Sequence, residues 1–255
     1  MAKVRIVTFE RSHPRAVADG VTSRAYLDGP RDPLHLLHHV LAQGTTMRIA
    51  GLPSDVLVYV LAGPIVAFGH SLASGSSMIV EFGAEAEIAA GAEGATVLAF
   101  IQAERPVDAR PGGHVHVLPR EAIPTTRDLG TRNEMGGGLH SDASCPTCTV
   151  WLHENDFHSK SGTTVPLHSH SEDEIIFVTA GLIGLGNRFY GPGTALAVAS
   201  GTRYGFEAPG TGLSFINYRA ASPTVTTAHG VMDEAGMWVS RLGRPRYADI
   251  AGGRA

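Results

Sequence analysis

One segment of the chain is written twice. Residues 44–63, "GTTMRIAGLPSDVLVYVLAG", align without a gap with residues 162–181, "GTTVPLHSHSEDEIIFVTAG", at an offset of 118. The match runs on at the same offset and is kept at the glycines; its pairs include Thr45/Thr163, Asp55/Asp173, Gly63/Gly181, Gly75/Gly193, Gly83/Gly201 and Gly94/Gly212. Self-similarity at a fixed offset is typical of a duplicated structural unit. We therefore predict two domains, residues 1–118 and 119–255.

The residues between these glycines predict β-strands. The runs are short and apolar: "DVLVYVLAG", "SSMIVEFG" and "ATVLAFIQ" in the first copy, and "EIIFVTAG", "TALAVASG" and "LSFINYRA" in the second. Hydrophobic residues make up 43% of the chain and charged residues only 17%, and there are 31 glycines. This composition suits a turn-rich β-sandwich or barrel with a filled core.

Few segments depart from this pattern. "PLHLLHHVLAQ", residues 33–43, fits a short helix or a strand, and "GVMDEAGMWVSRL", residues 230–242, fits a short helix. Residues 104–138 are rich in Pro, Gly and Arg, so we interpret them as the connection between the domains. His114 and His116 within that stretch have the spacing of a surface strand.

Only the second copy carries a cluster of metal-binding residue types. His168 and His170 are two residues apart, so on a strand both side chains point to one face, and Glu174 opens the next apolar run. Two imidazoles and a carboxylate of this kind can hold a first-row divalent metal and leave coordination positions open. Asp173 has a counterpart in Asp55 and is assigned to the bend. At the positions of the three ligands the first copy has Ala50, Leu52 and Val56.

These residues carry a family resemblance. The pattern Gly162-x5-His168-x-His170-x3-Glu174-x6-Gly181 resembles the first cupin motif at every defined position. The resemblance extends over most of the chain through the repeat. It implies an all-β protein of two tandem jelly-roll (double-stranded β-helix) cupin barrels, a bicupin, with a degenerate N-terminal barrel and a metal-binding C-terminal barrel.

The second cupin motif is met only in part. Gly193 and Gly201 are in place, but Ala199 stands where the family has Pro, Ala208 where it has Asn, and Tyr204 where it has the fourth metal ligand, His. Tyr204 would then be a phenolate ligand, a proton donor or substrate clamp, or a packed core residue. The first copy has Ala86 at that position.

Other side chains are candidates for substrate binding. Trp151, His153 and Asn155 alternate along one run, so they can share a face. His153 has a counterpart in His35, which argues against a metal role for it. Phe206 shares the inward face with Tyr204, and Asn217 lies in the last apolar run. We expect the substrate-binding residues to be Trp151, His153, Phe206 and Asn217.

The predicted function is that of an enzyme with one divalent metal ion per chain, Fe, Mn, Zn or Ni, acting on a small organic molecule. Open positions on a His-His-Glu metal suit dioxygenase-like chemistry, which we predict, and isomerase, lyase or hydrolase chemistry by Lewis-acid polarisation is the alternative. A non-catalytic small-molecule-binding cupin is the alternative from another class. A purely structural metal is disfavoured because such sites normally have a closed shell of protein ligands.

Charge and segment composition bear on partners and location. A net charge of −4 gives no reason to expect nucleic acid or an anionic membrane as a partner. No apolar run is long enough to span a bilayer and no signal peptide is evident, so a cytoplasmic location is expected. The resemblance implies a possible homodimer. Cys145 and Cys148 are the only cysteines, and we interpret them as ordinary loop thiols or a local disulfide rather than a redox pair or half of a zinc site.

Overall fold

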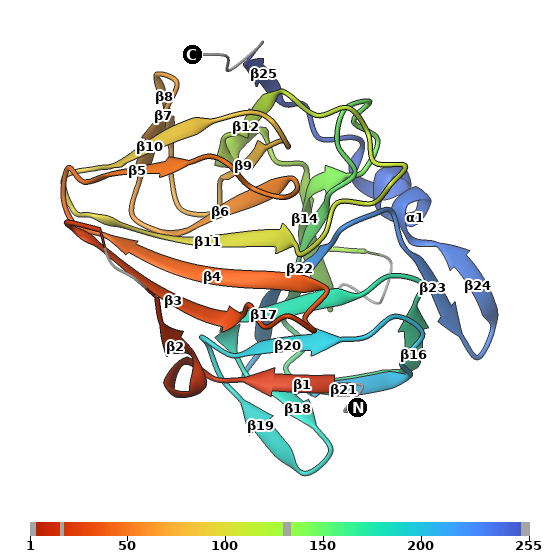
Figure 1. The fold of residues 1–255 in the computed structure, drawn as a ribbon. Coiled ribbons are helices and arrows are strands. Elements are labelled where there is room, and N and C mark those ends of the chain that lie inside the picture. Colours follow the sequence, from red (N-terminus) through yellow and green to blue (C-terminus); the bar gives the residue numbers. More distant parts are fainter. Residues whose placement is uncertain (1–3, 16–17, 130–133, 251–255) are drawn as a thin grey trace. The chain divides into compact units, whose positions relative to one another are not determined.

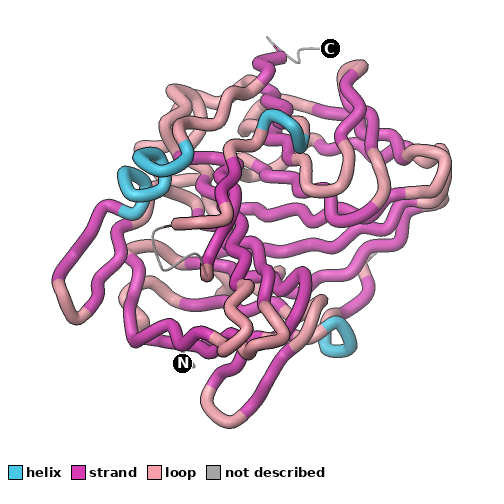
Figure 2. Tube along the Cα trace, turned by 180° about the vertical axis from the view of Figure 1, so that it is seen from behind, coloured by secondary structure: helices cyan, strands magenta, loops and turns pink. Residues whose placement is uncertain are grey.

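The protein is built almost entirely of antiparallel β-strands. The computed structural model describes residues 4–15, 18–129 and 134–250, so residues 130–133 of the expected connection lie outside it. The strands form four sheets, and the described residues contain one α-helix, α1 (Glu234–Leu242) (Figures 1 and 2). No helix in this part of the chain has the length and apolar character that crossing a membrane requires.

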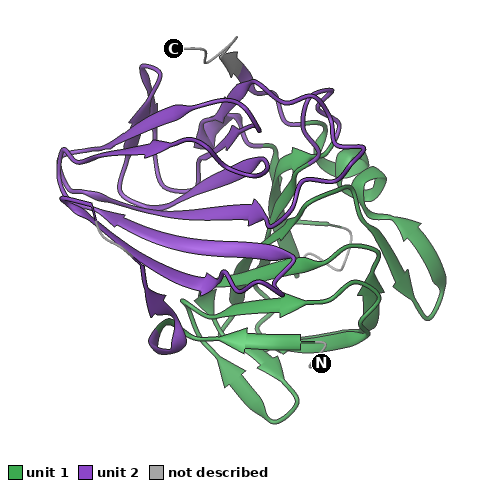
Figure 3. Cartoon of the chain, in the orientation of Figure 1, with its two compact units in different colours: residues 1–9, 124–143, 150–244 green, residues 10–123, 144–149, 245–255 purple. Residues whose placement is uncertain are grey.

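The chain divides into two compact units, and neither is one continuous stretch (Figure 3). The C-terminal unit comprises residues 1–9, 124–143 and 150–244, and the N-terminal unit comprises residues 10–123, 144–149 and 245–255. The predicted boundary at residue 118 differs from this division in four segments. It places residues 1–9 in the N-terminal domain, and residues 119–123, 144–149 and 245–255 in the C-terminal domain.

The N-terminal unit consists of two sheets. The larger has the order β2-β3-β4-β11-β6-β9-β12-β25 and the smaller has the order β5-β10-β7-β8. The strands are β2 (His13–Pro14), β3 (Val21–Leu27), β4 (Leu34–Leu41), β5 (Thr46–Ile49), β6 (Val56–Ala62), β7 (Ile65–Ala67), β8 (His70–Leu72), β9 (Ser77–Val80), β10 (Ala86–Ala90), β11 (Ala95–Gln102), β12 (Val115–Leu118) and β25 (Ala248–Ile250), with the 3-10 turns η1 (Phe9–Arg11) and η2 (Arg120–Ala122) in the same half of the chain.

The C-terminal unit repeats this plan. Its larger sheet has the order β1-β20-β17-β22-β15-β14-β13 and its smaller set the order β19-β18-β21-β16-β23-β24. The strands are β1 (Val4–Val7), β13 (Thr125–Thr126), β14 (Met135–Asp142), β15 (Trp151–Phe157), β16 (Thr163–His170), β17 (Glu174–Gly181), β18 (Ile183–Leu185), β19 (Arg188–Tyr190), β20 (Ala195–Val198), β21 (Tyr204–Ala208), β22 (Leu213–Arg219), β23 (Thr224–Thr227) and β24 (Gly230–Asp233).

Equivalent turns in the two units have the same local structure. A Cβ atom on Gly63 would lie 2.2 Å from the carbonyl oxygen of Gly94, and one on Gly181 would lie 2.1 Å from that of Gly212; all four glycines have positive φ. These turns therefore need glycine for both conformation and space. The bend assigned to Asp173 is confirmed, because its Oδ1 accepts a 2.8 Å hydrogen bond from the Ser200 amide. Asp55 accepts the matching bond in the other unit at the same distance.

The structure decides one open alternative and corrects several sequence expectations in detail. Residues 34–41 form the strand β4, because they pair with β3 and β11, so the helical alternative is excluded. The helix expected over 230–242 begins only at Glu234, after β24. The segment 104–138 is not only a connection, since it contains β12, β13 and the start of β14. His116 lies on a strand as expected, but that strand is buried rather than superficial.

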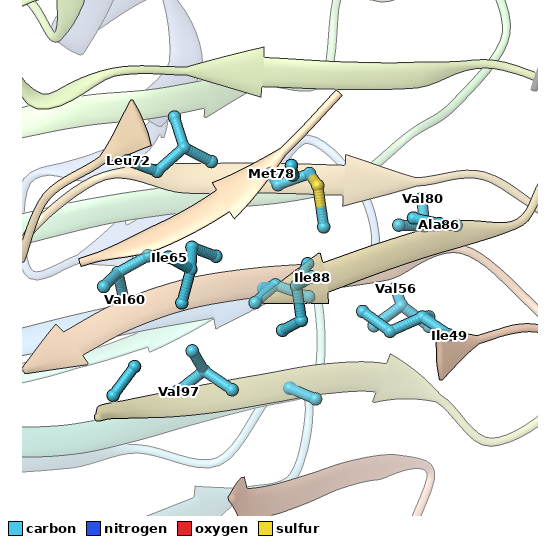
Figure 4. Packing of buried hydrophobic residues seen from close by; sticks show 14 of the residues in the cluster. Ile49, Val56, Val60, Ile65, Leu72, Met78, Val80, Ala86, Ile88 and Val97 are labelled. Carbon is cyan, nitrogen blue, oxygen red and sulfur yellow. The ribbon is translucent and has the colours of Figure 1, made fainter. Parts of the chain in front are cut away.

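The N-terminal unit is filled by an apolar core. Both of its sheets contribute residues to one buried cluster (Figure 4). The positions that correspond to Glu174, Tyr204 and Arg219 hold buried aliphatic residues of this cluster, Val56, Ala86 and Ile101. The inward face of this barrel is thus occupied by hydrocarbon, with no polar groups at those positions.

Candidate functional site

The C-terminal unit encloses a pocket of about 250 Å³. Its wall is largely aromatic and aliphatic, and its polar lining residues are His153, Asn155, His168, His170, Tyr204, Asn217, Arg219, Thr227 and Glu234. Pockets for drug-sized ligands measure about 300–1,000 Å³, so this one suits a smaller molecule. Six of the sequence-predicted site residues line it: His153, His168, His170, Tyr204, Phe206 and Asn217. The other two, Trp151 and Glu174, do not.

The pocket lies on the core face of the strands. On β22, Leu213 and Phe215 belong to the apolar core of the unit, and Asn217 and Arg219 continue the same alternation. On β21, Tyr204 and Phe206 share their inward face in the same way. These polar side chains of the pocket therefore occupy core-facing positions of the barrel strands, in line with apolar side chains on the same strands.

The two histidines of β16 each have Nδ1 close to an oxygen atom. His168 Nδ1 lies 2.8 Å from the carbonyl oxygen of Pro166, and His170 Nδ1 lies 2.9 Å from Glu234 Oε2. Their ring centroids are 5.0 Å apart. Burial lowers the pKa of His168. An oxygen partner on Nδ1 leaves Nε2 as the nitrogen that can serve a metal or a substrate.

Glu174 lies just behind the pocket wall and is almost completely buried. Its Oε2 accepts hydrogen bonds from Arg219 Nη2 at 2.7 Å and Asn217 Nδ2 at 3.0 Å, and lies 3.9 Å from His170 Nε2. Its Oε1 is buried without a hydrogen-bond partner among the described residues. A buried carboxylate oxygen with no partner is costly, so this atom is available to a ligand.

Arg219 joins two buried carboxylates. Besides Glu174 it donates to Glu234 Oε1 through Nη1 at 3.3 Å. Burial, the largest single influence, would raise the pKa of Glu234, but Arg219, His170 and His153 together outweigh it and lower that pKa. Burial likewise opposes the charge on Arg219, and Glu234 and Glu174 raise its pKa nevertheless. One guanidinium therefore faces the carboxyl groups of both Glu174 and Glu234.

Tyr204 lies beside the histidines, with its ring centroid 4.5 Å from that of His168. Burial, and then the charge of Glu174, raise the pKa of Tyr204 well above its usual value. Without a bound cation the phenol is therefore neutral near pH 7, whereas a nearby dication would favour the phenolate, so the phenolate-ligand alternative stays open.

The remaining candidates fall into two groups. His153 lines the pocket and accepts a 2.8 Å hydrogen bond from Trp151 Nε1, and burial lowers its pKa to about 3. Trp151 packs in a separate apolar cluster with Leu139 and Trp238. Trp151 therefore does not line the pocket and instead holds the His153 ring through this hydrogen bond.

Sequence reasoning missed Arg219 and Glu234. Arg219 had a usable signal, because it is two residues beyond Asn217 on the same strand and must share its face. Glu234 had none, since it comes from the start of α1, after the β23–β24 hairpin, and no spacing in the sequence indicates where that helix packs.

A second polar cluster lies in the N-terminal unit. Among the residues that the structure describes, one group of His, Cys and acidic side chains brings a ligand atom from every member within 4.8 Å of all the others: Glu81, His116, Cys145 and Cys148. This group could hold a metal ion. The set His168, His170 and Glu174 does not converge to that extent.

Comparison with known proteins identifies the fold. No protein-family model matches the sequence, and no curated protein matches it. A putative glyoxylate induced protein from Pseudomonas aeruginosa is similar in structure, with a TM-score of 0.69, 13% identity, and coverage of 86% of this chain and 88% of that one. The chain has the cupin jelly-roll fold.

Two further solved structures are also similar to this chain in fold. Protein Ylba from E. coli has a TM-score of 0.63 at 13% identity, with 85% of this chain and 90% of that chain covered. A variant of oxalate decarboxylase from Bacillus subtilis has a TM-score of 0.63 at 12% identity, with 85% and 77% covered. At these identities the likeness concerns the cupin fold alone, and function has to be argued from the site.

Proposed function

We propose that this cupin is a two-barrel enzyme whose C-terminal pocket acts on a small organic molecule with the help of one divalent metal ion. In this proposal the N-terminal barrel keeps the fold without that site. The observation that carries the proposal is the pair of pocket histidines, each with Nδ1 against an oxygen, beside a buried glutamate with one unpartnered oxygen.

The donor set fits a metal in three respects. Metal-ligating histidines usually have their second ring nitrogen on a carbonyl or carboxylate oxygen, as His168 and His170 do. Glu174 Oε1 is a buried oxygen without a hydrogen-bond partner among the described residues. Two acidic side chains, Glu174 and Glu234, face a single guanidinium, which favours a bound cation. His168, His170 and Glu174 would hold the ion, and Tyr204 would stand beside it as a neutral phenol.

Such an ion would supply Lewis-acid polarisation of the substrate or a binding position for dioxygen. The residues of the chain would orient the metal ligands and shape the substrate pocket. Arg219 and Asn217 fix the orientation of Glu174 through its other oxygen. Phe157, Phe206 and Phe215 form a mutually packed aromatic wall that excludes water and accepts an apolar part of the substrate.

Dioxygenase-like oxidation is our first choice of reaction, and isomerase, lyase or hydrolase chemistry is the alternative. The first consumes dioxygen and the second does not, so oxygen uptake separates them. A non-catalytic binder would retain a small molecule without converting it.

The test begins with metal content. The chain is purified without oxygen and analysed for elements, as wild type and as His168→Ala/His170→Ala. We expect the variant to lose one equivalent of metal, and the control His158→Ala/His229→Ala, at two exposed histidines outside the pocket, to lose none. Unchanged metal content in the pocket variant would refute a metal at this site. Oxygen uptake and product analysis with small organic acids and phenols as trial substrates then assign the reaction class.

A further inference from the structure

The second polar cluster lies on the outer side of the N-terminal sheet. Val115 and Val117 of β12 are fully buried in the apolar core, so the His116 ring between them points to the opposite face. Glu81 follows Val80, which pairs with Val115 across β9 and β12 and also belongs to the core. His116 Nε2 and Glu81 Oε1 meet there at 2.7 Å.

A cysteine-bearing loop completes the cluster. Residues 144–149 belong to the N-terminal unit and carry Cys145 and Cys148 as a C-x-x-C pair. Arg110 Nη1 donates to the carbonyl oxygen of Cys148 at 2.8 Å and also to that of Cys145. The loop carbonyl of Thr147 accepts a 3.0 Å bond from Gly112. Three carbonyl groups of the loop that carries the thiols are therefore hydrogen-bonded to the segment just before β12.

The distances within the group suit a small tetrahedral ion. Cys145 Sγ lies 3.7 Å from His116 Nε2 and 3.5 Å from Glu81 Oε1. In a tetrahedral zinc site with bonds of about 2.0–2.3 Å, neighbouring ligand atoms are about 3.3–3.8 Å apart. The 2.7 Å contact between His116 and Glu81 is a hydrogen bond, so an ion entering the group replaces a shared proton there.

Hydrogen bonds from the surroundings also orient the ligand side chains. The Thr147 amide donates to Cys145 Sγ at 3.4 Å, and the Thr147 hydroxyl donates to Glu81 Oε1 at 2.6 Å. Glu81 Oε2 accepts from the His114 amide at 3.0 Å. Such outer contacts orient metal ligands and are a regular part of metal sites.

We propose that Glu81, His116, Cys145 and Cys148 bind one zinc ion. Two thiolates and an imidazole favour zinc over the harder cations that oxygen ligands select. Binding releases the thiol protons to solvent. Four protein ligands close the coordination shell, so the ion is structural and fastens the 144–149 loop to the strands. This site is separate from the proposed catalytic metal and does not depend on it.

The test uses the reduced full-length chain with zinc alone as the probe. After incubation with zinc and desalting, elemental analysis should show one equivalent that Cys145→Ser/Cys148→Ser lacks and His168→Ala/His170→Ala retains. Glu81→Gln should weaken zinc binding at least ten-fold, since even outer-contact changes cost about 10–100-fold. Zinc retained in full by the cysteine variant would overturn the proposal, as would a reduced, folded wild type that takes up none.

A spectroscopic measurement covers the case in which the cysteine variant does not fold. Cobalt(II) added to the reduced wild type should give the visible bands of a tetrahedral ion and a thiolate charge-transfer band, and zinc should remove both. The same titration of His168→Ala/His170→Ala should give the same spectrum. Absence of the thiolate band in the folded, reduced wild type would overturn the proposal.

Discussion

The two units have the same strand plan but opposite interiors. In the C-terminal unit the inward face of the strands carries Tyr204 and Arg219 around a pocket, and in the N-terminal unit the same positions carry Ala86 and Ile101 in a closed core. The N-terminal unit instead places its polar cluster on the outer face of β12. A jelly roll tolerates either choice because each strand residue belongs to one face only.

This difference separates two kinds of polar site. Polar groups on the inward face border a hollow, so a ligand can reach them, and they suit binding or reaction. Polar groups outside the core, linked to a loop by short contacts, leave no room for a substrate. Variants at matched positions in the two units test this distinction.

The largest effect is expected from Arg219→Met. The guanidinium is completely buried between Glu174 and Glu234, so its removal leaves two unpaired buried carboxylates. Breaking such a network costs about 3–5 kcal/mol of unfolding free energy, measured by urea denaturation. At the matched position Ile101→Val should cost only about 0.5–1.5 kcal/mol. A loss below that of Ile101→Val would show that Arg219 is not needed to balance the acids.

The next effect concerns the outer cluster. Zinc at a hundred times its dissociation constant should stabilise the reduced chain by about 2.7 kcal/mol and raise its melting temperature by several degrees. With the pocket site removed by His168→Ala/His170→Ala, the added change Cys145→Ser/Cys148→Ser should abolish the zinc-dependent shift in the same thermal scan. An equal shift in that variant would place the stabilising ion elsewhere.

Much of this architecture is readable from the sequence, because strands and turns are local. The glycines at the repeat offset, the apolar runs and the Asp173 bend depend on neighbouring residues alone, and the structure confirms them. The lining residues His153, His168, His170, Tyr204, Phe206 and Asn217 follow from strand alternation in the same way.

Contacts between segments far apart in the sequence do not follow from local patterns, so the sequence did not predict which residues meet. Glu81 is 35 residues from His116 in the sequence, yet it lies beside His116 because β9 and β12 pair. Cys145 is a further 29 residues along and reaches the cluster through a loop contributed from the other half of the chain. The zinc interpretation of the cysteines was disfavoured for want of a second pair, and these partners could not be identified from spacing.

A smaller effect on the unfolding free energy should depend on pH. Burial lowers the pKa of His153 to about 3 from 6.5, so the unfolded chain binds the extra proton between these values. This contribution to stability is complete above about pH 6.5 and is lost as the pH falls toward 3, by up to about 1.4 kcal/mol per pH unit. Unfolding free energies at pH 7.5 and 5.0 should therefore differ less in His153→Gln than in wild type. His35→Gln, at the matched and less buried position, is the control; an equal change there would contradict the assignment.

The smallest change in stability is expected from Tyr204→Phe, yet it is the most informative about function. The ring keeps its packing against His168, so the unfolding free energy should change by no more than about 1.5 kcal/mol, the worth of one hydrogen bond. Because the phenol is neutral and buried, its hydroxyl can donate a proton or a hydrogen bond to a substrate. Removing a proton-transfer group should lower turnover by about 10²–10⁴-fold while the metal content is unchanged. A loss of metal would instead make the oxygen a ligand, and unchanged turnover, spectrum and metal would leave Tyr204 as a core residue, like Ala86 at the matched position.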